Sequence, residues 1–185
     1  MAFDEQIIQA CIDGDRTAQA KLYKKFASQM LGVCLRYTNS YDEAEDILQE
    51  GFIKVFYNLE NFRKEGSFEG WIKRIMINTA LNHYHQNKKN MESLDFDEIR
   101  EIDIRDDDEP EEIPYSESEM LEAFQTLPEG YKMVFNLYVF EDMMHKEIAE
   151  TLNISVNTSK SQLSKARVYL QKSLKRMKRR KAEKE

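Results

Sequence analysis

Residues 145–170 read HKEIAETLNISVNTSKSQLSKARVYL, and this stretch decides the fold of the C-terminal part of the chain. Apolar side chains at Ile148, Ala149 and Leu152 recur at helical spacing, which predicts a short helix over residues 145–152. Ala149 is small, as a residue must be where two helices cross closely. A second helix is therefore expected to pack across the first.

A turn and a longer helix follow. Asn153 can adopt the left-handed conformation that ends a helix, and Ser155 or Asn157 can cap the next one. The second helix is expected to bury Val156, Leu163, Ala166 and Leu170. It is expected to expose Asn157, Ser159, Lys160, Gln162, Ser164, Lys165 and Arg167. This arrangement has the spacing of a helix-turn-helix.

The exposed residue types of the second helix suit the major groove of DNA. Lysine and arginine contact guanine edges or phosphates, asparagine and glutamine can pair with adenine, and hydroxyl groups reach phosphates. An ordinary helical hairpin with a polar surface is the competing interpretation. The turn residues, the small alanine and the one-sided basic charge occur together, which favours DNA binding.

The charge of the chain is segregated along its length. Over 185 residues the net charge is −7. Residues 1–90 are neutral, residues 91–118 carry −11, and residues 119–185 carry +4. A basic C-terminal surface suits a contact with DNA. The basic tail from Lys172 to Lys184 is either a solvated helix end or a non-specific phosphate contact.

Helical patterns fill both ends of the chain and predict an all-α fold. Residues 17–37 and 68–86 each have helical periodicity, and Ser40 with Glu43 is a capping-box signal for a helix between them. Residues 91–118 have no sustained periodicity and hold Pro110 and Pro114 among many carboxylates. We expect two small helical domains, at 1–90 and 119–185, joined by a flexible acidic linker at 91–118.

Composition excludes several other classes of protein. Cys11 and Cys34 lie in helical patterns without short spacing to each other, which predicts buried thiols rather than a disulfide or a zinc site. The N-terminus does not read as a signal peptide, and no apolar run approaches the ~20 residues of a membrane span. We expect a cytoplasmic protein that needs no cofactor or metal and has no membrane partner.

Three stretches together resemble the extracytoplasmic-function (ECF) branch of the sigma-70 family. They are DEAEDILQEGFIKVFYNLENF at 42–62, FEGWIKRIMINTALNHYHQNKK at 68–89, and LPEGYKMVF with the helix-turn-helix at 127–167. The resemblance implies a sigma region 2 helical bundle and a sigma region 4 helix-turn-helix. It implies no catalytic activity, since RNA polymerase supplies the chemistry. The implied partners are promoter DNA, the clamp coiled coil and flap of core RNA polymerase, and an anti-sigma factor.

The same resemblance assigns roles to residues. The positions implied to bind the polymerase coiled coil are Asp46, Gln49 and Glu50. Those implied for the −10 element are Lys54, Phe62, Arg63, Lys64, Ser67, Trp71, Arg74 and Asn78. Phe62 and Asn78 are the better candidates for base contact, whereas Trp71 fits a core position. Those implied for the −35 element are Asn157, Lys160, Ser161, Gln162, Ser164, Lys165 and Arg167.

Two other functions compete with this assignment. A stand-alone DNA-binding regulator would use the helix-turn-helix but leaves the first domain without a role. An enzyme could be imagined around the carboxylates of residues 42–50 with His83, His85 and His145. Imidazoles two residues apart on a helix point roughly 200° apart, however, which makes a poor chelate for a metal.

Overall fold

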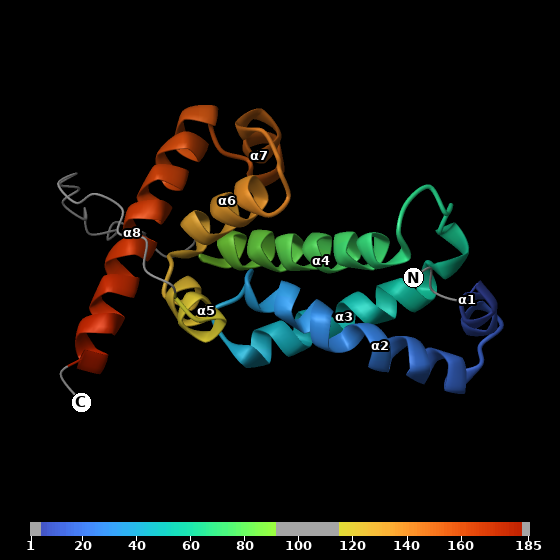
Figure 1. Ribbon diagram of the computed structural model, residues 1–185. Helices are drawn as coiled ribbons and strands as arrows, with labels where there is room; N and C mark the ends of the chain where they lie inside the picture. The colour runs from blue at the N-terminus through green and yellow to red at the C-terminus, as the bar shows by residue number, and fades with distance from the viewer. Residues whose placement is uncertain (1–4, 92–114, 183–185) are drawn as a thin grey trace. The chain divides into compact units, whose positions relative to one another are not determined.

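The computed structural model describes residues 5–91 and 115–182, and every regular element in these two ranges is a helix (Figure 1). The predicted all-α fold is confirmed. The chain divides into two compact units, Met1–Tyr84 and His85–Glu185. Most of the segment predicted as a linker, residues 92–114, lies outside the described residues. No helix within the described ranges is long and apolar enough to span a membrane.

The first unit is built from α1 (Glu5–Ile12), α2 (Arg16–Leu35), α3 (Tyr41–Tyr57), the short 3-10 helix η1 (Leu59–Asn61) and α4 (Phe68–Met91), which continues past Tyr84. Side-chain hydrogen bonds cap the N-termini of α2 and α3. Asp15 accepts the N–H groups of Thr17 and Ala18 at the start of α2, and Ser40 accepts the N–H of Glu43 at the start of α3. Each cap satisfies backbone donors that a helix leaves unpaired at its N-terminus.

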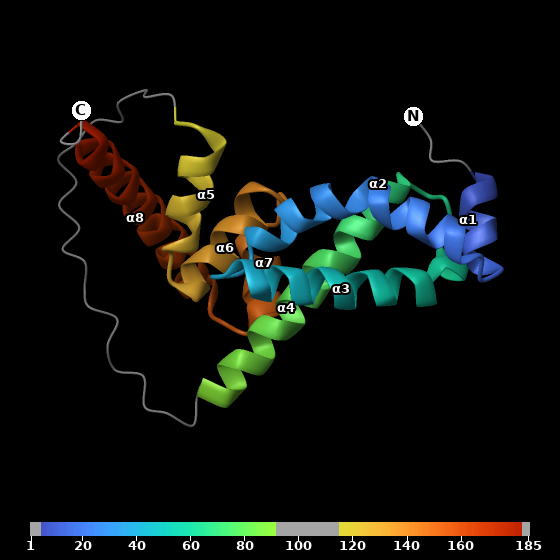
Figure 2. The same cartoon turned by 90° about the horizontal axis from the view of Figure 1, so that it is seen from below.

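The core of the first unit is formed by α2, α3 and α4. Helices α2 and α3 pack side by side (Figure 2), and Leu22, Val55 and Met76 are fully buried. Both cysteines are buried and unpaired, as predicted. Burial raises the pKa of the Cys34 thiol to about 12, so this thiol stays protonated at neutral pH.

The second unit contains α5 (Glu117–Gln125), α6 (Glu129–Val139), α7 (His145–Leu152) and α8 (Val156–Ala182). Helix α8 packs on each of the other three. Helix α5 begins with a capping box in which Ser116 and Glu119 each bind the other's backbone N–H. This first turn lies within the last residues of the stretch expected to be linker. Residues of α5, α6 and α8 form one core cluster, which includes Phe124, Leu170 and Leu174.

Candidate nucleic-acid and polymerase interfaces

The turn between α7 and α8 has the geometry that the sequence predicts. Asn153 ends α7 in the left-handed region, with φ 52° and ψ 53°. The Ile154 N–H donates to the carbonyl oxygen of Ala149 at 3.0 Å. Ser155 caps α8, because its Oγ accepts the Thr158 N–H at 2.9 Å. Of the two residues expected to compete for the cap, the structure thus uses Ser155.

Most of the residues expected to read the −35 element project outward from α8. Exposed side chains at these positions are Asn157, Lys160, Ser161, Ser164, Lys165 and Arg167. The expected exposure of Gln162 is only partly met. This side chain is half-buried, and a Cβ placed on Gly130 of α6 would lie 3.1 Å from its Nε2. Gln162 therefore turns toward the start of α6.

Two predictions about the buried face of α8 are wrong. Val156 is 39% exposed, and Ser159 is fully buried. Ser159 lies four residues before Leu163 and seven before Ala166, which puts it on the packed face. Its hydroxyl is accommodated there because Oγ lies 2.9 Å from Nδ1 of His145. Val156 is the first residue of α8, and its side chain reaches solvent.

A stack of side chains from α6, α7 and α8 lies beside the exposed face of α8. The rings of Tyr138 and His145 stack at 4.8 Å, and the Arg167 guanidinium lies 5.9 Å from the Tyr138 ring centre. Burial lowers the pKa of His145, and the nearby charges of Lys160 and Arg167 lower it further. The stack restrains Arg167 through a cation–π contact. Sequence periodicity missed it, because its members come from three helices.

In the first unit, Asp46 and Gln49 are exposed on α3, whereas Glu50 is part of a network. The Glu50 carboxylate lies 2.7 Å from the Lys54 ammonium and 2.5 Å from Nε2 of His83. The hydrogen bonds that the Glu50 carboxylate accepts, first from Lys54 and then from His83, lower the pKa of Glu50. Lys54 also donates to Thr79 Oγ1 at 3.2 Å. Glu50, expected to bind the polymerase, and Lys54, expected to bind the −10 element, thus form an ion pair with each other.

Two large apolar side chains extend the exposed face of α3. Ile53 is 68% exposed and Tyr57 is 87% exposed. They follow Asp46 by seven and eleven residues, which brings both to within about 20° of it around the helix. Exposed apolar residues that adjoin polar ones on one helix face make that face a candidate surface for a partner. The sequence offered a signal, since Ile53 and Tyr57 fall outside the spacing of the buried residues of α3.

An aromatic cluster joins the loop after η1 to the start of α4. Ring centres of Phe62 and Phe68 lie 5.1 Å apart, those of Phe62 and Trp71 5.4 Å, and those of Phe68 and Trp71 5.7 Å. Phe68 is buried, whereas Phe62 and Trp71 are half-buried. Part of each of these two rings therefore packs in the cluster while the rest reaches solvent.

The polar residues expected at the −10 element surround this cluster in the sequence. Arg63 and Lys64 are exposed in the loop, where Lys64 pairs with Glu5 at 2.9 Å. Ser67 Oγ accepts the Gly70 N–H at 3.0 Å in the first turn of α4. Arg74 and Asn78 are exposed and follow Trp71 by three and seven residues, which places all three on one side of α4.

Comparison with known proteins gives matches in both units. Residues 22–90 match the model of Sigma-70 region 2, and residues 117–170 match that of Sigma-70 region 4. The RNA polymerase sigma-H factor of Pseudomonas aeruginosa is 31% identical over 180 residues, covering 92% of this chain and 93% of the relative. The ECF RNA polymerase sigma-E factor of Haemophilus influenzae is 29% identical over 177 residues, covering 91% and 93%.

Among solved structures, the sigma factor RpoE in complex with the anti-sigma factor NepR from Bartonella quintana matches with a TM-score of 0.49 and 17% identity. This match covers 84% of the present chain and 96% of that one. The family assignment rests on the sequence matches, which span both units and nearly the whole chain. The protein therefore belongs to the ECF branch of the sigma-70 family of RNA polymerase sigma factors.

Proposed function

We propose that this protein directs core RNA polymerase to promoters by binding the polymerase and the −10 element through its first unit and the −35 element through its second. The observation that carries the proposal is the helix-turn-helix of α7 and α8, whose exposed face is polar and basic. The chain itself has no catalytic role in this proposal, because polymerase performs the chemistry. The protein then acts in the cytoplasm, where polymerase works.

At the −35 element, α8 enters the major groove. Lys160, Lys165 and Arg167 contact guanine edges or phosphates, while Asn157, Ser161 and Ser164 supply shorter polar contacts. The half-buried Gln162 turns toward the start of α6 and contributes by positioning α8 against that helix. Arg167 is the strongest candidate for base reading, because its contact with Tyr138 restrains a long side chain before binding.

At the −10 element, the first unit holds an opened single strand. Aromatic faces stack on bases and cations follow the backbone. Phe62 and Asn78 therefore contact flipped bases, with the half-exposed Trp71 beside them, while Lys54, Arg63, Lys64 and Arg74 approach phosphates. Ser67 fixes the start of α4. The half-exposed rings of Phe62 and Trp71 support this role, because a fully buried ring could not stack on a base.

The polymerase contact uses the outer face of α3. Asp46, Gln49 and Glu50 suit a basic coiled coil, and the exposed Ile53 and Tyr57 add apolar area to the same face. The second unit contacts the polymerase flap, and an anti-sigma factor covers these surfaces in the free protein. We further propose that the acidic residues of 91–118 favour a basic path on polymerase and discourage stray DNA binding; these residues lie almost entirely outside the described part of the chain.

Run-off transcription with core bacterial RNA polymerase tests the proposal. We expect initiation that depends on this protein at promoters sharing two elements. Lys160→Ala is expected to reduce initiation roughly tenfold, the effect of losing about 1.4 kcal/mol of binding. Lys21→Ala on α2 removes the same charge from an exposed position outside the proposed interfaces and serves as the control. Tight duplex binding without any polymerase binding would instead support a stand-alone regulator.

A further inference from the structure

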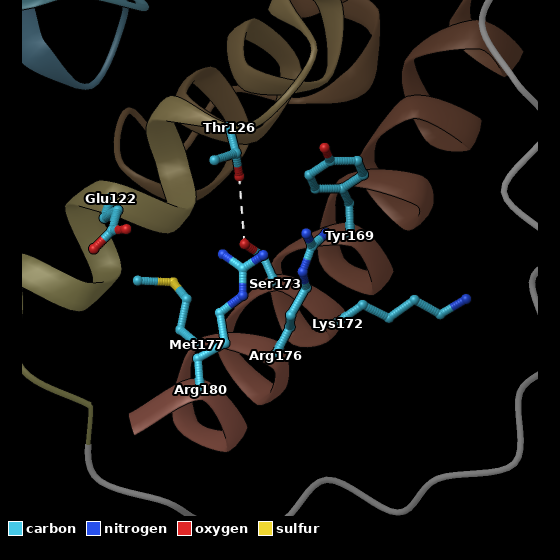
Figure 3. Close-up of a pocket in the computed structure, with 8 residues that line it drawn as sticks. All are labelled: Glu122, Thr126, Tyr169, Lys172, Ser173, Arg176, Met177 and Arg180. Carbon is cyan, nitrogen blue, oxygen red and sulfur yellow. Dashed lines mark hydrogen bonds between the residues drawn. The ribbon is translucent and has the colours of Figure 1, made fainter. Parts of the chain in front are cut away.

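A groove of about 340 Å³ lies between α5 and the C-terminal half of α8, apart from the surfaces discussed above (Figure 3). Half-buried Tyr169 and Met177 contribute apolar surface to it. Both side chains also pack against the core cluster of this unit. The groove is therefore a depression in a packed surface, framed by two helices of the same unit.

The α8 wall of the groove is cationic. Lys172, Arg176 and Arg180 line it at intervals of four residues, which aligns them along one side of the helix. All three are exposed. Glu122 of α5 is the acidic residue of the lining, so the groove keeps a positive balance. An apolar floor beside a row of cations suits an acidic segment that also carries apolar side chains.

This stripe of cations, formed by Lys172, Arg176 and Arg180, is separate from the face of α8 that carries Lys160. Sixteen residues divide Lys160 from Arg176, which corresponds to a rotation of roughly 160° around α8. A DNA duplex whose major groove is contacted by Lys160 would not face the stripe of cations directly. An anionic group in the groove would therefore be something other than the promoter duplex proposed to bind the face of Lys160.

The direction of the two helices shows where the chain approaches the groove. Thr126 and Ser173 hydroxyls lie 3.4 Å apart, and Glu122, one turn earlier on α5, lies near Met177, one turn later on α8 (Figure 3). The helices therefore run antiparallel, and the start of α5 lies toward Arg180. Tyr115, just before α5, packs against the same core cluster as Met177.

The segment that ends at this point is strongly acidic. Residues 92–114 carry 12 acidic and 2 basic side chains, together with scattered apolar residues that include Ile104 and Ile113. The groove from Arg180 to Lys172 spans eight residues of helix, or about 12 Å. Six residues of extended chain before Tyr115 reach roughly 20 Å, which is sufficient to follow it. Covalent attachment also provides an effective concentration on the order of millimolar.

We propose that the groove between α5 and α8 binds the acidic segment 92–114 of the same chain, with carboxylates against Lys172, Arg176 and Arg180 and apolar side chains over Tyr169 and Met177. The occupant is chosen by charge complementarity and by the place where the segment joins α5. In this state the segment neutralises part of the basic tail. The tail is thereby less available for non-specific contact with phosphates.

Zero-length carbodiimide crosslinking of the full chain tests the proposal, with peptide mass spectrometry to locate amides between lysines and carboxylates. We expect Lys172 to crosslink to residues 106–112 roughly fivefold more than Lys178, a ratio equivalent to about 1 kcal/mol. Lys178 is an exposed lysine on another side of α8. The preference is expected to disappear in 1 M salt, where the screening length falls to about 3 Å.

Charge-matched variants separate this docking from general attraction between an acidic segment and a basic helix. Arg176→Ala with Arg180→Ala should abolish the preference for Lys172, whereas Lys175→Ala with Arg179→Ala should preserve it. Glu122→Gln should increase it, because a like charge is removed from the groove. Equal crosslinking of Lys172 and Lys178 in the unmodified protein would overturn the proposal. Crosslinks that join isotope-labelled to unlabelled chains would also overturn it and identify a second copy as the occupant.

Discussion

At the scale of single residues, Asn153 decides the angle between α7 and α8. Its φ of 52° is a conformation that most side chains adopt at a cost of roughly 1–2 kcal/mol, and asparagine and glycine adopt more easily. We expect Asn153→Ala to destabilise the second unit by about 1 kcal/mol and Asn153→Gly to leave its stability nearly unchanged. Urea unfolding followed by circular dichroism measures both variants. Equal losses in the two variants would show that the side chain matters, rather than the backbone conformation.

Glu50 makes the stability of the first unit depend on pH. Hydrogen bonds donated by Lys54 and then by His83 lower its pKa below the ordinary value of 4.5. The contribution of this carboxylate is therefore present above pH 4.5 and is lost as pH falls through the lower pKa of the folded state. We expect the difference in unfolding free energy between the unmodified protein and Glu50→Gln to shrink over that acidic window. A difference that stays constant there would contradict the assignment.

At the scale of elements, helix positions follow from the sequence better than the partners of individual side chains do. The turn at Asn153 and the cap at Ser155 are local, so the residue types alone indicate them. The burial of Ser159 does not follow from the helical pattern, because its partner, His145, comes from a different helix. The pairing of Glu50 with His83 could not be predicted for the same reason, since 33 residues separate them.

The contact between α3 and α4 depends on the absence of a side chain at Gly51. A Cβ there would lie 2.2 Å from the sulfur of fully buried Met76. Alanine would gain about 1 kcal/mol of helix propensity but cost roughly 1–3 kcal/mol by overpacking. We expect Gly51→Ala to lower the thermal midpoint and Met76→Val to relieve part of that loss in the double variant. If the effects of the two single substitutions on the thermal midpoint simply add, the alanine side chain at position 51 does not clash with Met76.

At the scale of the whole molecule, the two units have separate cores. Leu22 lies in one and Leu137 in the other, and both are almost completely buried. Replacement of either by alanine is expected to cost about 2–5 kcal/mol, confined to its own unit. Hydrogen exchange measured by mass spectrometry resolves this, because faster exchange should stay within the unit that carries the substitution. Equal acceleration in both units would show that they unfold together.

The candidate interfaces were predictable to different degrees. The exposed lysines of α8 follow from a helical pattern with one buried side, so Lys160 and Lys165 lie where expected. The stack that restrains Arg167 and the groove beside Arg176 each require several helices to meet. Such features depend on packing over long distances in the sequence, which periodicity alone does not encode.

Helix α8 also has a mechanical consequence. Its 27 residues correspond to a rod of about 40 Å. Lys160 lies in its first turns, and Ser173, which contacts Thr126 at the end of α5, lies about 20 Å farther along. A continuous helix of this length rotates as one rigid element. A ligand that changed the angle of α8 at its contact with α5 would therefore also change the angle of the end proposed to contact DNA. The orientation of the end proposed to contact DNA is therefore coupled to what binds the C-terminal half of the same helix.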